Sequence, residues 1–217
     1  MVPRKPAVQL SREQVASALA PFLADLSISE AHISQIQRYI GTLLSWNQSV
    51  SLTSIEDPLE IVTRHFGESI FAASLLPIRL GRLADVGSGA GFPGLPLRIV
   101  SQVLKVVLLE PNLKKCGFLN EVKGALGMDD VEVRRCRYEE YRSDREEFDF
   151  VCARALGGYR PLLRWARNVL KPQGRVVLWL GADDALMISR TSGWLWELPA
   201  RIPESHKRFV LIGRREP

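Results

Sequence analysis

The chain has 217 residues, of which 46% are apolar and 24% are charged, an ordinary composition for a globular protein. Its net charge of +5 favours a polyanionic partner without identifying one. No apolar run approaches the roughly 18 residues of a membrane span, and the first 14 residues lack the apolar stretch of an export signal. The three cysteines, Cys116, Cys136 and Cys152, match no metal-ligand spacing and cannot pair completely. We therefore expect a cytoplasmic protein with no metal site and no membrane partner.

The N-terminal part of the chain predicts helices. Apolar residues recur at helical spacing after an N-cap at Ser29, and an Asp-Pro pair at residues 57–58 starts another helix. His65 has no partner at metal-ligand spacing, so we interpret it as a structural or hydrogen-bonding histidine. We expect a helical cap over residues 1–65 and a larger core over residues 66–217.

The stretch from Arg82 to Val100 predicts a strand, a glycine-rich loop and a helix. The strand ends at Val86, and four glycines follow within eight residues: Gly87, Gly89, Gly91 and Gly94. Glycines permit positive φ and let a ligand approach the main chain, while the helix N-terminus favours an anionic or electron-rich group. The loop also contains the dinucleotide-binding pattern, but in that pattern the first glycine follows the strand directly.

A different register fits the loop better. The pattern Asp-x-Gly-x-Gly-x-Gly, beginning at Asp85, resembles the first motif of class I S-adenosylmethionine (SAM) methyltransferases, whose loop wraps the amino-acid part of SAM. A second acid, Glu110, ends the next apolar run, 23 residues after Gly87. At the tip of a neighbouring parallel strand, a carboxylate accepts both ribose hydroxyls of SAM or of NAD. The alternative interpretation of Glu110 is an ordinary helix-capping acid.

Helical and strand patterns alternate beyond Glu110 and indicate an α/β fold. We expect a helix over Asn112–Leu126, strands over Val131–Val133, Phe148–Ala153 and Gly174–Leu180, and an antiparallel hairpin from the runs Trp194–Ile202 and Arg208–Ile212. An antiparallel ending favours a methyltransferase over a symmetric dinucleotide-binding domain.

Three residues beyond the ends of the later strands are candidates for ligand contacts. Tyr138 and Glu139 follow the third strand and would touch an adenine, although a surface turn is an equal alternative. Arg154 ends the fourth strand at the carboxyl edge, where open α/β sheets bind ligands. Its guanidinium group would hold the carboxylate of SAM or a phosphate of the substrate.

Two groups of basic residues favour a phosphate-rich partner. A predicted helix over Tyr159–Leu170 places four cations on one stripe, with no acid among them: Arg160, Arg164, Arg167 and Lys171. A second set lies near the C-terminus: Arg201, Lys207, Arg208, Arg214 and Arg215. Either set alone is equally well explained as a solvated surface, and only together do they indicate nucleic acid.

The glycine motif and its surroundings resemble the bacterial RsmG (GidB) methyltransferases over roughly residues 30–181. The strings are DVGSGAGFPGLPLRIV, with WNQSVSLTSIEDPLEIVTRHFGESI before it and LLEPNLKKCGFLNEV and FDFVCARAL after it. These enzymes use SAM to methylate the N7 of a guanine in 16S rRNA. The resemblance implies a class I, Rossmann-like fold with a mostly parallel seven-stranded sheet and an N-terminal helical extension. It also implies SAM as cofactor and 16S rRNA or the small ribosomal subunit as partner.

The resemblance also assigns residues. It implies that SAM lies against the motif residues Asp85, Gly87, Gly89 and Phe92, beside Glu110, Pro111, Asn112, Tyr138 and Glu139, and near Arg154. Three positions depart from the family pattern: Ser51 replaces Asn, Glu68 replaces Asp, and Leu180 replaces Lys. Because the missing Lys is a candidate RNA or cofactor contact, we expect another base, such as Arg154 or Lys171, to take its role.

Methylation of guanine N7 needs no general base, because this nitrogen carries a lone pair and no proton at neutral pH. Alignment and a water-poor pocket are sufficient, so we expect no catalytic acid or base and give Arg154 an orienting role. Motifs for methylation of exocyclic amines or pyrimidine carbons are absent, and Cys152 lies in an apolar run typical of a structural thiol. A methyltransferase acting on a small molecule or another RNA, a nicotinamide-dependent oxidoreductase and a non-catalytic RNA-binding protein remain alternatives. We expect a monomer.

Overall fold

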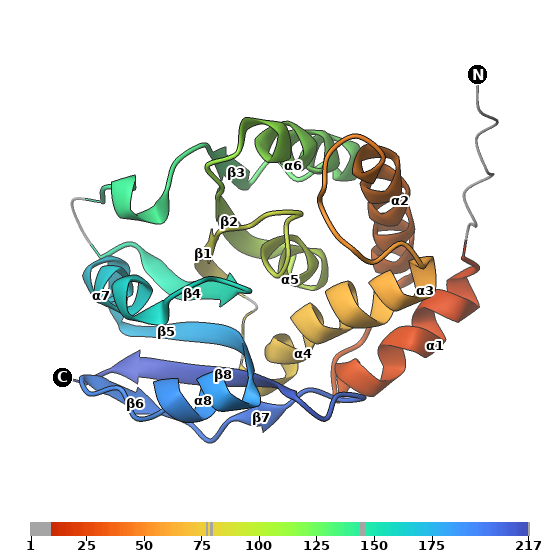
Figure 1. The fold of residues 1–217 in the computed structure, drawn as a ribbon. Coiled ribbons are helices and arrows are strands. Elements are labelled where there is room, and N and C mark those ends of the chain that lie inside the picture. The colour runs from red at the N-terminus through yellow and green to blue at the C-terminus, as the bar shows by residue number, and fades with distance from the viewer. Residues whose placement is uncertain (1–9, 77, 79, 144–145, 217) are drawn as a thin grey trace.

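A central, mostly parallel β-sheet forms the core of the computed structural model, which describes residues 10–76, 78, 80–143 and 146–216 (Figure 1). Seven strands follow the order β3-β2-β1-β4-β5-β8-β6, and the short β7 pairs with β8. Strands β1 to β5 are parallel, whereas β8 runs antiparallel to β5, β6 and β7. The bounds are β1 Leu80–Val86, β2 Val103–Leu109, β3 Val131–Arg134, β4 Phe148–Arg154, β5 Leu170–Gly181, β6 Trp194–Trp196, β7 Ala200–Arg201 and β8 Arg208–Arg215. The predicted antiparallel ending is confirmed.

Helices precede the sheet and connect its strands. Their bounds are α1 Arg12–Leu23, α2 Glu30–Asn47, α3 Pro58–Ile61, η1 Val62–Gly67, α4 Glu68–Leu75, α5 Gly94–Val100, α6 Leu113–Leu126, η2 Tyr138–Glu140, α7 Tyr159–Val169 and α8 Ala182–Ile188. The predicted start signals are confirmed, because the Ser29 hydroxyl caps α2 and the Asp57 carboxylate caps α3. Among the described residues, no helix is both long and apolar enough to cross a bilayer.

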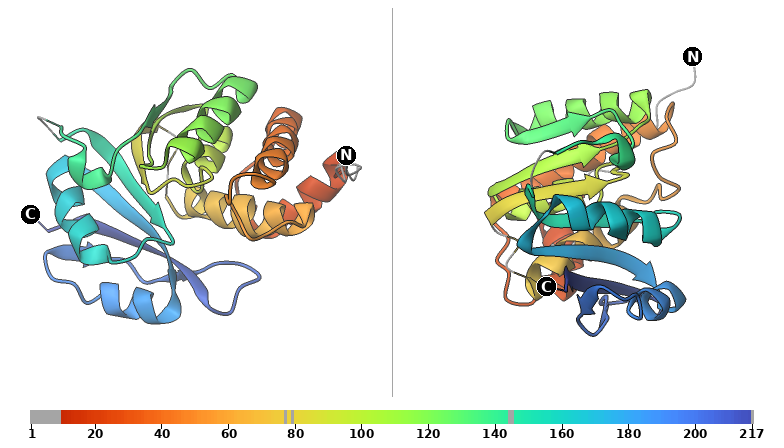
Figure 2. Two further views of the ribbon diagram at one scale, coloured as in Figure 1. Left: turned by 45° about the horizontal axis from the view of Figure 1, so that its top comes forward. Right: turned by 90° about the vertical axis from the view of Figure 1, so that its left-hand side faces the viewer.

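The sheet separates two apolar cores because alternate residues of each strand point to opposite faces. In β1, Leu83 belongs to the core that includes the N-terminal helices, α5 and α6, whereas Ala84 and Val86 belong to the core beneath α7 and α8. The two helical layers lie on opposite sides of the sheet in Figure 2. Both faces are therefore covered, as a parallel sheet requires.

The N-terminal helices share their core with the rest of the protein. Val15 of α1 and Ile36 of α2 are fully buried in the same cluster as Leu97 of α5 and Leu119 of α6. From residue 58 to residue 75 the chain is helical without interruption, so the boundary predicted after residue 65 falls inside a helical run. The first nine residues, on which part of the export-signal prediction rests, lie outside the described residues.

Candidate cofactor site at the carboxyl edge of the sheet

The glycine loop follows β1 at the carboxyl edge of the sheet. Gly87, Gly89 and Gly91 have φ values of 69°, 57° and 83°, in the left-handed region that favours glycine. The Gly87 N–H donates to the Leu109 carbonyl at 2.9 Å, which joins the loop to the end of β2. The prediction of a loop with positive φ is confirmed, and its main chain is free of side-chain bulk at three alternate positions.

Asp85 is completely buried beneath this loop. One carboxyl oxygen accepts the Gly94 N–H at 3.0 Å, at the first residue of α5, and the other has no hydrogen-bond partner among the described residues. Burial raises the pKa of Asp85 to about 7, against the opposing effect of the Gly94 N–H and of the Ser88 hydroxyl, which donates to the Asp85 main-chain carbonyl at 2.9 Å. The Asp85 carboxyl therefore connects the end of β1 to α5 and titrates near neutral pH.

Glu110 makes a second connection across the loop. One carboxylate oxygen accepts the Gly89 N–H at 2.9 Å, and the other accepts the Asn112 N–H at 2.8 Å. Only 5% of Glu110 is exposed. The N-cap of α6 is Asn112, whose side-chain oxygen accepts two N–H groups of the first turn, so the interpretation of Glu110 as the helix-capping acid is wrong. The carboxylate instead lies against the glycine loop, with lone pairs left for a further donor.

The Phe92 ring anchors the loop in the N-terminal helical layer. It stacks on Tyr39 at a centroid distance of 5.3 Å and on His65 at 4.6 Å, and it meets Phe66 edge-on at 5.3 Å. The Tyr39 hydroxyl also donates to the Ala90 carbonyl at 2.5 Å. The ring predicted to contact SAM is thus packed among aromatic side chains, and only 8% of Phe92 is exposed.

His65 has a structural role, as predicted. Its Nε2 lies 2.7 Å from the Thr53 hydroxyl, while its ring stacks on Phe92. Burial, together with the positive charges of Arg154 and Arg64, lowers the pKa of His65 to about 3. The imidazole is therefore neutral at physiological pH.

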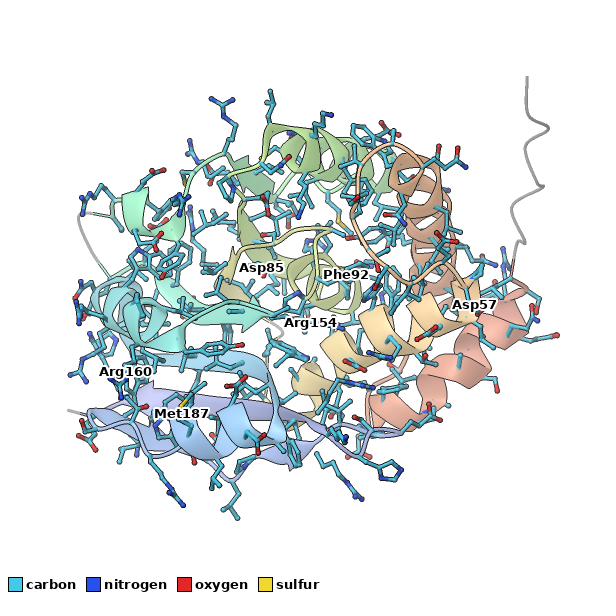
Figure 3. The ribbon with its side chains drawn as sticks, viewed as in Figure 1. Asp57, Asp85, Phe92, Arg154, Arg160 and Met187 are labelled. Atoms are coloured by element: carbon cyan, nitrogen blue, oxygen red, sulfur yellow. The ribbon has the colours of Figure 1, made fainter. Side chains whose placement is uncertain are left out.

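A buried carboxylate gathers three arginines next to the loop. Glu68 is 2% exposed and pairs with Arg208 at 2.7 Å, with Arg64 at 3.2 Å and with Arg154 at 3.4 Å. One terminal nitrogen of Arg154 is buried and has no hydrogen-bond partner in the described ranges. Because Arg64 also pairs with Glu60, three arginines face two carboxylates, and the cluster keeps a net positive charge at the edge where Figure 3 places Arg154.

Sequence reasoning missed this role of Glu68 and treated it only as a departure from a family pattern. A signal was present, because Glu68 is a lone acid at the start of the apolar segment SIFAASLL. An acid in such a segment is buried only when it is paired. Arg64 lies four residues before Glu68, a spacing that the sequence shows, whereas Arg154 and Arg208 come from β4 and β8, which sequence spacing does not connect to it.

A family model described as rRNA small subunit methyltransferase G matches residues 32–191 of this chain. The chain belongs to that family. Its relatives include the ribosomal RNA small subunit methyltransferase G of Roseiflexus castenholzii, which is 39% identical over 86% of this chain and 85% of that protein. The Lactococcus lactis protein of the same name is 30% identical over 94% of this chain and 90% of that protein.

Solved structures confirm the class I methyltransferase fold of this rRNA small subunit methyltransferase G family member. A SAM-dependent methyltransferase from Aquifex aeolicus matches with a TM-score of 0.61 and 16% identity, over 74% of this chain and 94% of that chain. A precorrin-6y C5,15-methyltransferase from Geobacter metallireducens matches with a TM-score of 0.56 and 18% identity, over 68% and 87% of the two chains.

The remaining predicted cofactor contacts of this family member lie near the end of β3. Tyr138 and Glu139 form the start of η2, where the Tyr138 ring packs edge-on against Trp165 at 5.5 Å. Partial burial and the neighbouring Glu139 raise the pKa of Tyr138 to about 12. Glu139 is exposed to solvent. Contact of either residue with an adenine stays a prediction.

The predicted stripe of four cations is wrong at Lys171. Helix α7 carries Arg160, Arg164 and Arg167, but it ends at Val169, and Lys171 belongs to β5. The Lys171 ammonium lies 2.8 Å from Asp149 near the start of β4, at the edge of the sheet opposite the glycine loop. Because Lys171 lies at the opposite edge, the expectation that it takes the role of the lysine implied by the family resemblance at position 180 is wrong.

The basic set near the C-terminus is also divided. Arg208 pairs with Glu68, and Arg215 pairs with Glu146 and donates to the Arg167 carbonyl at 3.1 Å. Its other members, Arg201, Lys207 and Arg214, are exposed. Leu180 is buried in the core beneath α7 and α8, so it makes no polar contact at the edge. These pairings were not visible in the sequence because the partners are far apart along the chain.

We predict that Gly94→Ala destabilises the protein through the contact at Asp85. A Cβ at Gly94 would lie 2.7 Å from the Asp85 carboxyl oxygen and 2.9 Å from a Leu108 methyl carbon. We expect urea denaturation to show a loss of about 1–3 kcal/mol in the free energy of unfolding. Gly124→Ala in α6 is the control, because a Cβ there meets no described atom within 4 Å. Equal losses of stability in Gly94→Ala and Gly124→Ala would contradict the proposal that Asp85 leaves no space for a side chain at residue 94.

We predict a distinct pH dependence for Asp85→Asn. The folded-state pKa of about 7 lies above the unfolded value of about 4, so the folded protein retains a proton that the unfolded chain releases. The contribution of Asp85 to stability is therefore present at low pH and is lost as the pH rises through 7. His65 has the opposite effect, because its lowered pKa makes the folded state more stable as the pH rises from about 3 to 6.5. This effect is the same in wild type and in Asp85→Asn.

The measurement is the free energy of unfolding of wild type and Asp85→Asn from pH 5 to pH 8. We expect wild type to lose stability relative to Asp85→Asn across this range. Parallel profiles for the two proteins would show that the Asp85 carboxyl does not titrate there.

Proposed function

We propose that this protein transfers the methyl group of SAM to the N7 of a guanine in the 16S rRNA of the small ribosomal subunit. The observation that carries the proposal is the glycine loop held between Asp85 and Glu110 at the carboxyl edge of the sheet, in a member of the rRNA small subunit methyltransferase G family. We also propose that the protein acts as a cytoplasmic monomer on the rRNA or the assembled subunit.

SAM is the cofactor, and the residues at this edge fit it. The proposed contacts are Asp85, Gly87, Gly89, Phe92, Glu110, Pro111, Asn112, Tyr138, Glu139 and Arg154. Gly87 and Gly89 leave the loop main chain open to close approach, whereas Gly91 packs against Tyr39 and Leu95, and Glu110 retains lone pairs for ribose hydroxyls. The unpartnered nitrogen of Arg154 is available to an anionic group. Because the Phe92 ring is packed inside, we expect its main chain to face the cofactor.

Bound SAM supplies an electrophilic methyl group, and this chain supplies alignment and a water-poor site. Guanine N7 has no proton to remove, so no general base is required. The structure supports this chemistry, because His65 is neutral but engaged with Thr53 and Phe92. Cys152 is fully buried, and burial raises its thiol pKa, so it is no nucleophile. Arg154 is the proposed orienting residue.

The proposed function is tested by mapping N7-methylguanine in ribosomal RNA from cells with and without this protein. We expect the loss of one site in 16S rRNA and its return when the wild-type protein is supplied again. An unchanged map would contradict the proposal and would favour a small molecule or another RNA as substrate.

The cofactor site is tested separately with Glu110→Gln. This substitution keeps the side-chain size but removes one acceptor and the negative charge, so we expect affinity for S-adenosylhomocysteine to fall about tenfold or more by calorimetry. Glu121→Gln is the control, because the Glu121 carboxylate bonds to Trp46 on the surface between α6 and α2. Unchanged affinity in Glu110→Gln, with an intact fold by circular dichroism, would exclude Glu110 from the site.

A further inference from the structure

A basic groove lies between α7 and the segment that follows α8, on the side of the sheet away from the N-terminal helices. The cavity has a volume of about 540 Å³. Four arginines line it, Arg160, Arg164, Arg167 and Arg190, together with the apolar side chains of Leu163 and Trp194. We call it the α7–α8 groove. Figure 3 shows Arg160 and Met187, which also lines the groove, at the same side of the molecule.

The charge in the α7–α8 groove is not balanced by the protein. Arg160, Arg164 and Arg190 are exposed, and their side chains make no ion pair or hydrogen bond within the part of the chain that the structure describes. No acid is among the described residues that line the groove. Arg167 differs, since it donates to the Gly193 carbonyl and shapes the wall. Elsewhere, arginines such as Arg98 are paired with acids, so the groove concentrates cations that an anionic partner would neutralise.

The arginines are spaced along the groove in a way that fits an extended partner. Arg160, Arg164 and Arg167 lie on one face of α7 and span about 10 Å along the helix axis, at 1.5 Å per residue. Arg190 faces them across the groove, from the segment after α8. Single small anions need only one such group, whereas a row of guanidinium groups along a groove fits a chain of phosphates.

The groove also leads away from the candidate cofactor site. Helix α7 begins at Tyr159, five residues after Arg154 at the end of β4, and α8 begins directly after β5. Both helices thus start at the carboxyl edge that holds the glycine loop. Arg160 lies in the first turn of α7 at this edge, whereas Arg190 follows the end of α8, so an RNA strand with its target base at the edge would extend along α7 to occupy the whole groove.

We propose that the α7–α8 groove binds the phosphate backbone of the RNA substrate beside the target nucleotide. Arg160, Arg164 and Arg190 contact phosphates, and Met187, which is 61% exposed, contacts the sugar or base between them. This inference rests on the proposed function and adds the place where the RNA is held. Phosphate contacts position a nucleic acid without reading its sequence, so the groove determines affinity and salt dependence and leaves the choice of target base to the cofactor site.

The experiment compares two triple variants that each remove three positive charges. The groove variant is R160Q/R164Q/R190Q, which leaves the structural Arg167 in place. The control is R12Q/K105Q/K171Q, because Arg12 and Lys171 pair with acids and Lys105 is exposed on β2, all away from the groove. Equal changes in net charge keep the long-range field comparable. The probe is protein-free 16S rRNA, titrated at several salt concentrations.

We expect the groove variant to lower the slope of log affinity against log salt by about 2, corresponding to three lost phosphate contacts, and to weaken binding on the order of 100-fold at 0.1 M salt. KM for RNA should rise while kcat and the affinity for S-adenosylhomocysteine stay unchanged. The control should retain both the slope and the affinity. Circular dichroism melts establish that each variant is folded.

Equal losses in the two variants, or weaker binding with no change in slope, would overturn the groove proposal. Failure of the proposed function is a different result. It would appear as wild-type protein that binds RNA with the expected salt dependence but neither binds S-adenosylhomocysteine nor methylates 16S rRNA.

Discussion

The hydrogen bond from the Gly94 N–H to the buried Asp85 carboxylate is the constraint on which the candidate site depends. It joins the last turn of the loop to the strand from which the loop departs, so both ends of the glycine segment are fixed at one carboxyl group. Glu110 then fixes the middle of the loop from the neighbouring strand, through the Gly89 N–H. The aromatic stack around Phe92 closes the outer side. Three independent attachments therefore hold a segment whose own residues have little intrinsic preference for one conformation.

Positive charge is used in two different ways in this molecule. Around Glu68, three arginines are partly buried and share one carboxylate, which fixes their positions before any ligand arrives. In the α7–α8 groove, Arg160, Arg164 and Arg190 are exposed, and their side chains make no ion pair within the described residues. We propose that the first arrangement orients a ligand at the carboxyl edge, and that the second attracts RNA with a strength that depends on ionic strength.

The sequence predicted the features that local spacing encodes. The end of β1 at Val86, the N-caps Ser29 and Asp57 and the glycine loop all depend on residues close together in the chain, and all are confirmed. Failures arose where the answer depended on tertiary contacts. Lys171 was placed on a helix by a spacing that continues past the actual helix end, and the surroundings of Glu68 were not predicted because its partners lie up to 140 residues away.

The aromatic contacts of Phe92 show that the glycine motif depends on residues outside the motif. All three rings that pack on it, those of Tyr39, His65 and Phe66, belong to helices encoded before the first strand. A fragment that begins at β1 would contain the whole diagnostic motif, yet it would expose the apolar Phe92 ring to water. The glycine motif that can be recognised in the sequence is therefore shorter than the part of the chain that holds the loop in place, because that part also includes the N-terminal helices.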